Sequence, residues 1–202
     1  MGRFSQAIAE GDGISIVPIL EGEVAGLAAL AEDAGAEAVA VRERSEVEAA
    51  RAHTALPIIV MDAVVELGGP PPSADACVLT YGSFSEDGRL ENAHAALVEH
   101  GIDCVVEVRD EEELEEVLER VDPEVILISE RDVEDGEDLE RTLDLLPSVP
   151  AGKLVVSESR VDVREQVVAL ERAGVDAVLV GADVLRTTDF SAALAELTGQ
   201  RG

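Results

Sequence analysis

Residues 153–181 read KLVVSESRVDVREQVVALERAGVDAVLVG, and this stretch decides the fold. It opens with a β-branched run, continues as an amphipathic helical pattern and returns to a second β-branched run. The helical pattern closes at Gly174, and the next apolar run follows within three residues, as expected for a helix end that leads into a short loop. Two apolar runs joined by a helix indicate a parallel strand–helix–strand unit.

Outward from this unit, the same alternation continues over the whole chain. The apolar runs are near-continuous, as expected when both faces of a parallel sheet are covered. Eight strand–helix units in about 200 residues predict a minimal (β/α)8 barrel, or TIM barrel, that forms a single domain over residues 1–202. An open doubly wound sheet, which usually has fewer strands, is the alternative. The predicted strands are 14–20, 38–41, 57–61, 76–80, 104–108, 125–129, 153–157 and 177–180.

The third unit of this pattern is irregular. Between its strand and the next one stands DAVVELGGPPPSAD (62–75), where a full helix is expected. Three consecutive prolines cannot continue a helix, so we expect a degenerate third helix of one or two turns at most. The missing helix makes this unit, with its Gly-Gly-Pro-Pro-Pro segment (68–72), the place where an interface with another protein or a second copy is expected.

The charge balance of the chain is extreme. Asp and Glu total 44 against 15 Lys plus Arg, for a formal net charge of −29, and Lys153 is the only lysine. Self-repulsion of this size destabilises a compact state unless salt screens it, and the screening length falls to roughly 3 Å at molar salt. The composition therefore favours a protein adapted to a salt-rich cytoplasm, as in halophilic archaea, over an ordinary acidic protein.

The same charge argues against two classes of partner. Nucleic acid phosphates and anionic membrane surfaces both attract basic patches, and a polyanion is repelled by them. No apolar window approaches the roughly 20 residues that span a bilayer, and the first residues carry no signal-peptide run. We therefore expect a soluble, cytoplasmic protein that binds neither nucleic acid nor membrane.

Residue types that commonly bind metals are few. Cys77 and Cys104 fall inside apolar strand-like runs, where small buried core residues are expected rather than a disulfide or a metal pair. The histidines lie on helical segments with no paired spacing, so a helix-surface role is expected for His53, His94 and His100. We expect neither a metal nor a cofactor.

The C-terminal half resembles the indole-3-glycerol phosphate synthase family. The resemblance runs through CVVEVRDEEELEEVL (104–118), the segment from VILIS to VVSES (125–159) and ALERAGVDAVLVGADVLRT (169–187), and more weakly through the N-terminal half. It implies a barrel that closes an indole ring on a phosphorylated ribulose-type substrate, in tryptophan biosynthesis. The family's chemistry uses two lysines, several glutamates, an orienting asparagine and a phosphate held by the seventh and eighth strand–helix loops.

Part of the family's site is present in this sequence. The resemblance implies catalytic positions at Glu107, which ends the fifth strand, at Glu158, which ends the seventh, and at Arg131 after the sixth. Ser159 and Gly181 match positions in the phosphate-binding loops. The two glutamates lie where barrel active sites lie and could form a working carboxylate pair, but an inherited pair that now serves as salt partners for Arg131 or Arg160 is favoured.

The lysines of the family are absent. The third-strand lysine becomes Met61, and the first-strand glutamate and lysine fall within PILE (18–21), either at positions 18 and 20 or at positions 19 and 21. Lys153 cannot replace them, because it enters its strand at the N-terminal end, while active sites of barrels lie at the C-terminal ends. Methionine cannot donate a proton, so the family reaction is not expected here.

Other family positions are also changed. The sixth-strand asparagine becomes Ser129, a phosphate-loop glycine becomes Arg160, and the eighth-strand serine becomes Ala182. An arginine beside the old phosphate loop can bind a phosphate bidentately, or it can neutralise Glu158 or point into solvent. The N-terminal helical extension, which caps the site in the family, is truncated to about a dozen residues.

These observations favour a catalytically degenerate barrel that binds a small phosphorylated or anionic metabolite at its C-terminal face. The expected ligand-binding residues are Ser129, Ser159, Arg160, Gly181 and Ala182. Two alternatives remain. The first is an enzyme, either an active but altered synthase or a barrel that runs another reaction with the two glutamates and Arg131. The second is a structural partner in a protein complex. The residues after the second and fourth strands (42–44 and 80–81) also face the predicted mouth, where a solvated loop is favoured over ligand contact.

Overall fold

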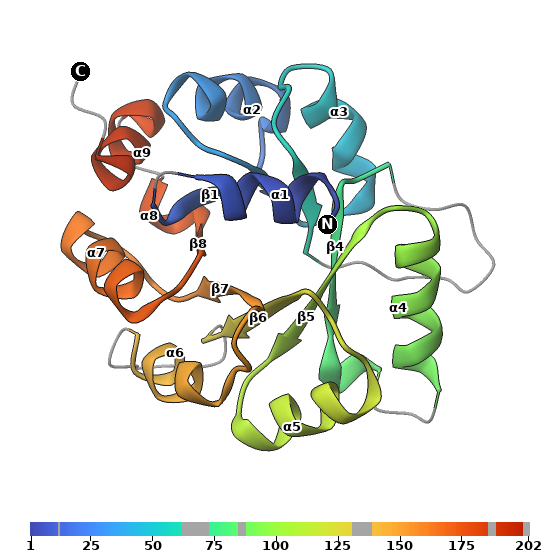
Figure 1. The fold of residues 1–202 in the computed structure, drawn as a ribbon. Coiled ribbons are helices and arrows are strands. Elements are labelled where there is room, and N and C mark those ends of the chain that lie inside the picture. The colour runs from blue at the N-terminus through green and yellow to red at the C-terminus, as the bar shows by residue number, and fades with distance from the viewer. Residues whose placement is uncertain (12, 62–72, 85–87, 131–138, 186–188, 200–202) are drawn as a thin grey trace.

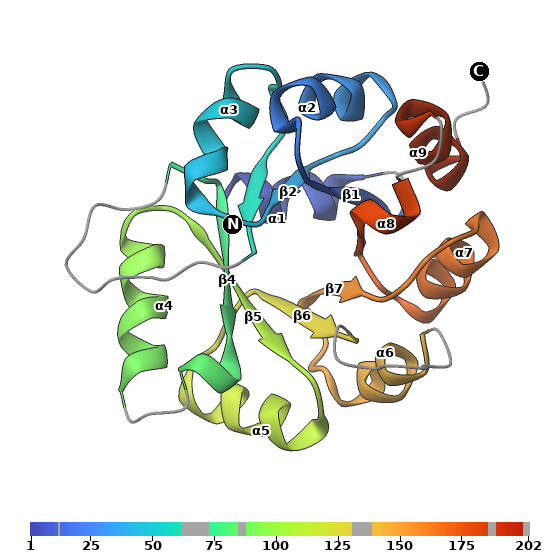
Figure 2. The ribbon, with the colours of Figure 1, turned by 180° about the vertical axis from the view of Figure 1, so that it is seen from behind.

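The computed structural model is a closed barrel of eight parallel strands in sequential order. Helices surround the barrel on its outside (Figures 1 and 2). The structure describes residues 1–11, 13–61, 73–84, 88–130, 139–185 and 189–199. The predicted (β/α)8 fold is confirmed, and the alternative of an open sheet is wrong because the first strand pairs with the last one.

The strands follow the predicted apolar runs to within a residue at each end. They are β1 (Ser15–Leu20), β2 (Val39–Val41), β3 (Ile58–Val60), β4 (Ala76–Thr80), β5 (Asp103–Val108), β6 (Val125–Ser129), β7 (Leu154–Glu158) and β8 (Ala177–Val180).

Helical segments connect most of these strands within the described ranges. The α-helices are α1 (Arg3–Glu10), α2 (Val24–Asp33), α3 (Val47–Arg51), α4 (Arg89–Glu99), α5 (Glu111–Arg120), α6 (Glu140–Leu145), α7 (Arg164–Ala173), α8 (Ala182–Leu185) and α9 (Phe190–Thr198), and short 3-10 turns are η1 (Arg44–Glu46), η2 (Tyr81–Ser83) and η3 (Leu146–Ser148).

The helix ends show the expected capping chemistry. The Asp110 side chain accepts a hydrogen bond from the Glu113 backbone N–H at 2.8 Å, and three acidic residues occupy the first turn of α5. The sequence run DEEELEE is therefore a charge-complemented helix start. Helix α7 ends at Gly174, whose φ of 105° lies in the left-handed region that favours glycine.

Alternation along the strands separates two hydrophobic cores. One core contains two side chains of α1 and residues in or directly beside the strands, and its strand members come from alternate positions, such as Val17 and Ile19 of β1. The positions between them, such as Leu20, pack with the surrounding helices in the second core. The first core is therefore the inside of the barrel, and this parity fixes which side chains can reach the barrel mouth.

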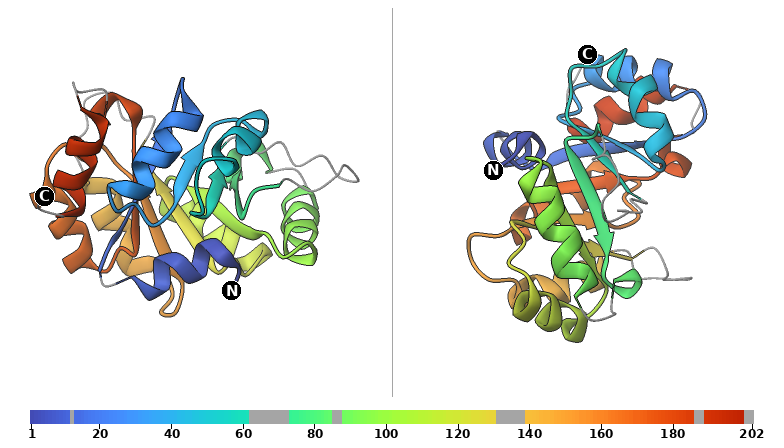
Figure 3. Two further views of the ribbon diagram at one scale, coloured as in Figure 1. Left: turned by 90° about the horizontal axis from the view of Figure 1, so that it is seen from above. Right: turned by 90° about the vertical axis from the view of Figure 1, so that its right-hand side faces the viewer.

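Helix α1 closes the N-terminal end of the barrel. Phe4 and Ile8 are 0% and 2% exposed and pack among the inward-facing strand residues. The side view in Figure 3 shows α1 lying across one end of the barrel. Helix α1 therefore covers the end of the barrel opposite to the strand C-termini. The apolar face of α1 packs against the N-terminal end of the barrel core.

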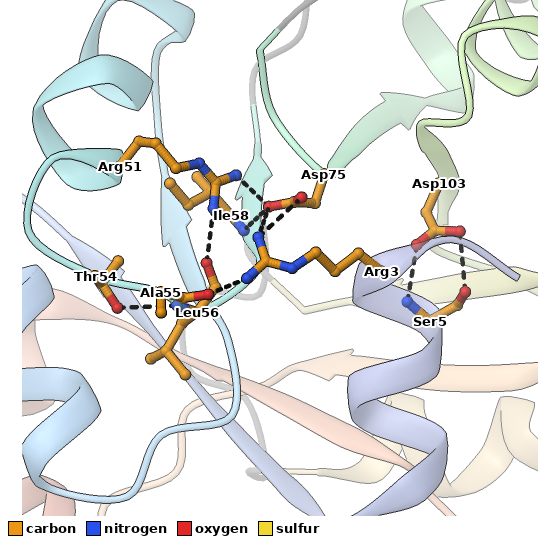
Figure 4. Close-up of polar contacts among 9 residues, drawn as sticks. All are labelled: Arg3, Ser5, Arg51, Thr54, Ala55, Leu56, Ile58, Asp75 and Asp103. Carbon is orange, nitrogen blue, oxygen red and sulfur yellow. Dashed lines mark hydrogen bonds and ion pairs between the residues drawn. The ribbon is translucent and has the colours of Figure 1, made fainter.

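Two aspartates fasten α1 to the ends of the strands (Figure 4). The Asp103 carboxylate accepts hydrogen bonds from the backbone N–H groups of Gly2 and Ser5, both at 2.8 Å, and from the Ser5 hydroxyl at 2.9 Å. Asp75 pairs with Arg3 of α1 and with Arg51 of α3. A carboxylate at a helix N-terminus is stabilising, so Asp103 serves as the cap that the N-terminus of α1 lacks in its own sequence.

The predicted degenerate third helix and its proline run fall on residues 62–72, outside the described residues. Both cysteines are buried and free, as expected from their positions in strands. Within the described ranges, no helix combines the length and apolar character needed to cross a bilayer.

Candidate functional site

The carboxyl ends of the strands bring polar side chains to one end of the barrel. Continuing the inward parity of each strand places the following residues at this mouth: Glu21, Arg42, Met61, Thr80, Glu107, Ser129, Glu158 and Gly181. In β1 the inward positions are Val17 and Ile19, so of the two pairs of positions left open by the sequence, 19 and 21 are the pair that faces into the barrel.

Glu107 is a buried carboxylate in the wall of the mouth. It is 2% exposed, and its Oε2 accepts a hydrogen bond from the Thr80 hydroxyl at 2.7 Å. The Arg109 Nε lies 3.9 Å from the other oxygen. These contacts satisfy a charge that would otherwise be costly to bury. Thr80, for which the sequence favoured a solvated loop, therefore positions the β5 carboxylate.

Glu158 and Ser129 lie on paired strands, where they are register partners. The Ser129 hydroxyl is 3.4 Å from Oε2 of Glu158, and the Arg141 side chain donates to the Ser129 backbone carbonyl at 2.7 Å. The structure thus gathers Glu158, Ser129 and Arg141 at the β6–β7 side of the mouth. Arg131 lies outside the described residues. Arg141 could not be recognised as a site residue from the sequence, because an arginine near the start of a helix in an acidic segment is common.

Ser159 points away from the mouth. Because Glu158 faces inward, its neighbours Ser157 and Ser159 face the helix layer, and their hydroxyls lie 2.6 Å apart. Both also contact the Thr142 hydroxyl, which bonds to the Glu130 carboxylate at 2.9 Å. The Ser159 hydroxyl is therefore part of a buried polar cluster between β7 and α6, and its side chain holds the loop in place.

Arg160 and Gly181 lie in the loops where the resemblance places phosphate. The Arg160 side chain is 66% exposed, and its Nε pairs with Asp162 at 3.2 Å. Gly181 follows β8, and Ala182 begins the short helix α8 (Figure 2). Gly181 and Ala182 are both half-buried.

A salt bridge joins the first two strands at the mouth. The Arg42 Nε lies 3.2 Å from Oε1 of Glu21, and both side chains are about one-third exposed, at 33% and 32%. The sequence could not reveal this pair, because the register of β1 decides whether residue 21 faces inward at all. Glu21 thus puts a negative charge at the mouth, and Arg42, which directly follows β2, supplies the compensating cation.

Lys153 lies at the other end of the barrel. It precedes β7, and its Nζ forms an ion pair with Asp122. The Lys153 hydrogen bond lowers the pKa of the Asp122 carboxyl below its usual value. The only lysine of the chain therefore takes part in a contact on the N-terminal face and cannot reach the mouth.

The remaining titratable groups give no sign of a metal centre. In the described ranges, no group of three or more His, Cys, Asp or Glu side chains is arranged to hold a metal ion. Burial raises the pKa of the Cys77 thiol to about 12 and also raises that of Cys104, so neither is a ready thiolate. His94 lies beside Asp122 on the N-terminal face, and desolvation lowers its pKa.

The fold and the site together define a (β/α)8 barrel whose mouth carries glutamates from β5 and β7, together with Glu21 after β1, and no lysine. The family model for indole-3-glycerol phosphate synthase matches residues 72–197. Because this match covers more than half of the chain, the protein belongs to the indole-3-glycerol phosphate synthase family.

Individual relatives agree with this assignment. An indole-3-glycerol phosphate synthase of Geobacillus sp. (strain WCH70) is 32% identical over 179 residues, which cover 82% of this chain and 69% of that protein. The one of Variovorax paradoxus (strain S110) is 36% identical over 153 residues, which cover 73% of this chain and 57% of that protein. The chain thus spans between about half and two thirds of the length of such relatives.

Two solved structures share the fold at low sequence identity. A thiamine phosphate pyrophosphorylase from Pyrococcus furiosus has a TM-score of 0.70 at 21% identity, covering 92% of this chain and 94% of that chain. The (S)-3-O-geranylgeranylglyceryl phosphate synthase from Thermoplasma acidophilum, solved with its substrate sn-glycerol-1-phosphate, has a TM-score of 0.67 at 16% identity, covering 98% of each chain. At these identities the likeness concerns the fold alone.

Proposed function

We propose that this family member binds a small phosphorylated metabolite at the C-terminal face of its barrel and does not carry out the family's ring closure. The observation that carries the proposal is the position of Lys153. It is the only lysine, it precedes β7, and it pairs with Asp122 at the end of the barrel opposite to the mouth.

The missing lysines act on the chemical step. Met61, at the inward position where the family places its third-strand lysine, is fully buried and has no proton to give. A positioned general acid contributes roughly 10²- to 10⁴-fold to a rate, which corresponds to about 3–5 kcal/mol of activation free energy. The glutamates cannot take over this role while they are ionised, because a carboxylate only accepts protons.

The loops after β7 and β8 are the proposed phosphate site. The guanidinium of Arg160 is largely exposed to solvent and is therefore accessible to a ligand. Gly181 allows close approach of a ligand to the backbone beside α8. The barrel of the Thermoplasma synthase, which shares this fold, was solved with a glycerol phosphate. Ser129 lies at the inner wall of the same mouth, between the two glutamate-bearing strands.

A titration with sn-glycerol 1-phosphate in molar KCl, followed by calorimetry, tests the binding part of the proposal. We expect saturable binding that weakens about tenfold or more in Arg160→Gln, because a charge-assisted contact to phosphate is lost. Arg172→Gln is the matched control, since Arg172 is exposed at the far end of α7 and the substitution changes the net charge equally. Absence of saturable binding by the folded wild-type protein would contradict the proposal.

We also propose that the protein works in concentrated salt. A net charge of −29 on 202 residues repels itself over a screening length of roughly 10 Å at 0.1 M salt and roughly 3 Å at 1 M. The urea midpoint of unfolding should therefore rise steadily between 0.1 M and 2 M KCl. A midpoint that stays constant over this range would refute the proposal.

A further inference from the structure

A buried chain of hydroxyl groups lies on the helix side of the sheet, between β7 and α6. The Thr142 hydroxyl lies 2.9 Å from that of Ser157 and 3.1 Å from that of Ser159, and the two serine hydroxyls lie 2.6 Å apart. All three side chains are buried. This hydroxyl chain ends on a carboxylate, because the Thr142 hydroxyl donates to Oε1 of Glu130 at 2.9 Å.

The count of hydrogens gives the hydroxyl chain a direction. Each hydroxyl has one hydrogen to donate, and an ionised carboxylate only accepts. The Thr142 hydrogen is therefore directed to Glu130, and the Thr142 oxygen is left to accept from Ser157 or Ser159. Hydrogen bonds in such a buried series polarise one another and are electrostatically stronger than in water. Glu130 thus sets the orientation of the hydroxyls.

Glu130 also fixes the start of α6. Its Oε1 accepts from the Thr142 backbone N–H at 2.9 Å, and its Oε2 accepts from the Leu139 backbone N–H at 3.2 Å. Within the described ranges, Leu139 is the only residue other than glycine with a positive φ, at 84°. A leucine is strained in this conformation and keeps it only where the surrounding structure holds it. Thr142 therefore lies on a helix start that is held firmly against the end of β6.

Ser159 is the member of the hydroxyl chain that belongs to a loop. Ser157 lies inside β7, where Ile128 of β6 and Val178 of β8 are its register partners. Ser159 directly follows β7 and begins the loop that carries Arg160 and leads to α7. The Ser159 side chain is thus the point at which the start of this loop is tied to α6.

The next two residues of the loop have backbone donors to offer. The N–H groups of Arg160 and Val161 find no acceptor among the residues that the structure describes. Val161 is fully buried, and a buried N–H without a protein partner usually binds water or a ligand. Both N–H groups follow Ser159 in the backbone, so their position depends on how firmly this serine is held.

We propose that Thr142 and Glu130 are positioning residues for the proposed phosphate loop and act on it through the Ser159 hydroxyl. They hold the first residue of the loop against α6, so the backbone donors of Arg160 and Val161 are in place before a ligand arrives. Donors that are already ordered bind more tightly, because association then does not have to order the loop. This inference rests on the proposed phosphate binding and needs no contact between the ligand and the hydroxyl chain.

Two serine-to-alanine substitutions test the proposal as a matched pair. Ser157→Ala and Ser159→Ala each remove one buried hydroxyl that contacts Thr142, but only Ser159 begins the loop. The affinity for sn-glycerol 1-phosphate is measured by calorimetry in molar KCl. We expect Ser159→Ala to weaken binding about fivefold or more, because the ligand must then order the start of the loop, and Ser157→Ala to stay within about twofold of wild type.

Thr142 provides a second pair of variants. Thr142→Val removes the hydroxyl and keeps the shape of the side chain, whereas Thr142→Ser keeps the hydroxyl. We expect Thr142→Val to weaken phosphate binding about as much as Ser159→Ala does, and Thr142→Ser to retain the wild-type affinity within about twofold. This rescue separates the hydroxyl from the packing of the threonine methyl group. Circular dichroism in the same buffer shows which variants are folded.

The failures of the two proposals are distinguishable. If the wild-type protein binds sn-glycerol 1-phosphate and Arg160→Gln weakens this binding, a wild-type affinity in folded Ser159→Ala would overturn the positioning role and keep the phosphate site. Equal weakening by Ser157→Ala and Ser159→Ala would also overturn the role, because the effect would then be a general loss of packing. A folded wild-type protein that binds no phosphate probe would overturn both proposals.

Discussion

Replacing Phe4 with alanine tests whether α1 is a structural part of the barrel. The Phe4 ring is 0% exposed and packs with inward-facing strand residues at the N-terminal end of the barrel. Truncating a buried phenylalanine typically costs about 3–5 kcal/mol, from the lost burial and the cavity left behind. Since domains are commonly stable by about 5–15 kcal/mol, Phe4→Ala should remain folded in the absence of denaturant but lose a large part of its margin.

Urea unfolding followed by far-ultraviolet circular dichroism, at a constant 2 M KCl, measures this loss. Circular dichroism is the suitable signal because the chain has no tryptophan. Gln6→Ala is the control on the same helix, since the Gln6 side chain is exposed and donates to Glu10 one turn away, and it should change stability by less than about 0.5 kcal/mol. A loss below about 1 kcal/mol for Phe4→Ala would refute the reasoning, because α1 would then not be part of the core.

Three further predictions concern contacts made by residues that do not line the barrel mouth. The Arg120 hydrogen bond lowers the pKa of Glu91 to about 2, so the stability that ionised Glu91 contributes is present above about pH 4.5 and is lost as the pH falls toward 2; the gap in urea midpoint between wild type and Glu91→Gln should shrink from pH 6 to pH 3, and a constant gap would contradict this. Thr142→Val should cost about 2–3 kcal/mol in urea unfolding, because it leaves partners of a fully buried hydroxyl unsatisfied; a neutral effect would show that water replaces them. Asp103→Ala should destabilise the protein by about 2–3 kcal/mol in the same assay, because it uncaps α1, and should leave the affinity of the folded protein for phosphate probes unchanged; weaker binding would indicate that the N-terminal end communicates with the mouth.

Most of the fold could be predicted because each strand corresponds to a nearly continuous apolar run in the sequence. Strands buried on both faces need Val, Ile, Leu and Ala at consecutive positions, and β4, β6 and β8 coincide with such runs to the residue. The position of α1 could not be predicted. Phe4 and Ile8 mark an apolar face, but a helix of this kind can cover either end of a barrel, and the contacts with Asp75 and Asp103 depend on strand ends distant in sequence.

The candidate site was predicted in part. Glu107 and Glu158 lie at inward positions at the C-terminal ends of β5 and β7, within a residue of where the sequence placed them, because strand parity carries them there. The same parity sends Ser159 outward, and this signal was already present in the sequence, since adjacent strand residues face opposite ways. The Glu21–Arg42 pair required the register of β1, which the apolar run of that strand does not specify.

The most direct test of the central claim is turnover of the family's substrate. Carboxyphenylaminodeoxyribulose phosphate is supplied to the folded protein in molar KCl, and the fluorescence of the indole product is followed against a background without tryptophan. The Geobacillus relative, assayed in its own buffer, shows that the substrate is competent. With Lys153 confined to the N-terminal face, we expect no rise above the protein-free rate. Turnover that Glu107→Ala or Glu158→Ala abolishes would show that the barrel closes the ring without lysine, and would contradict the account.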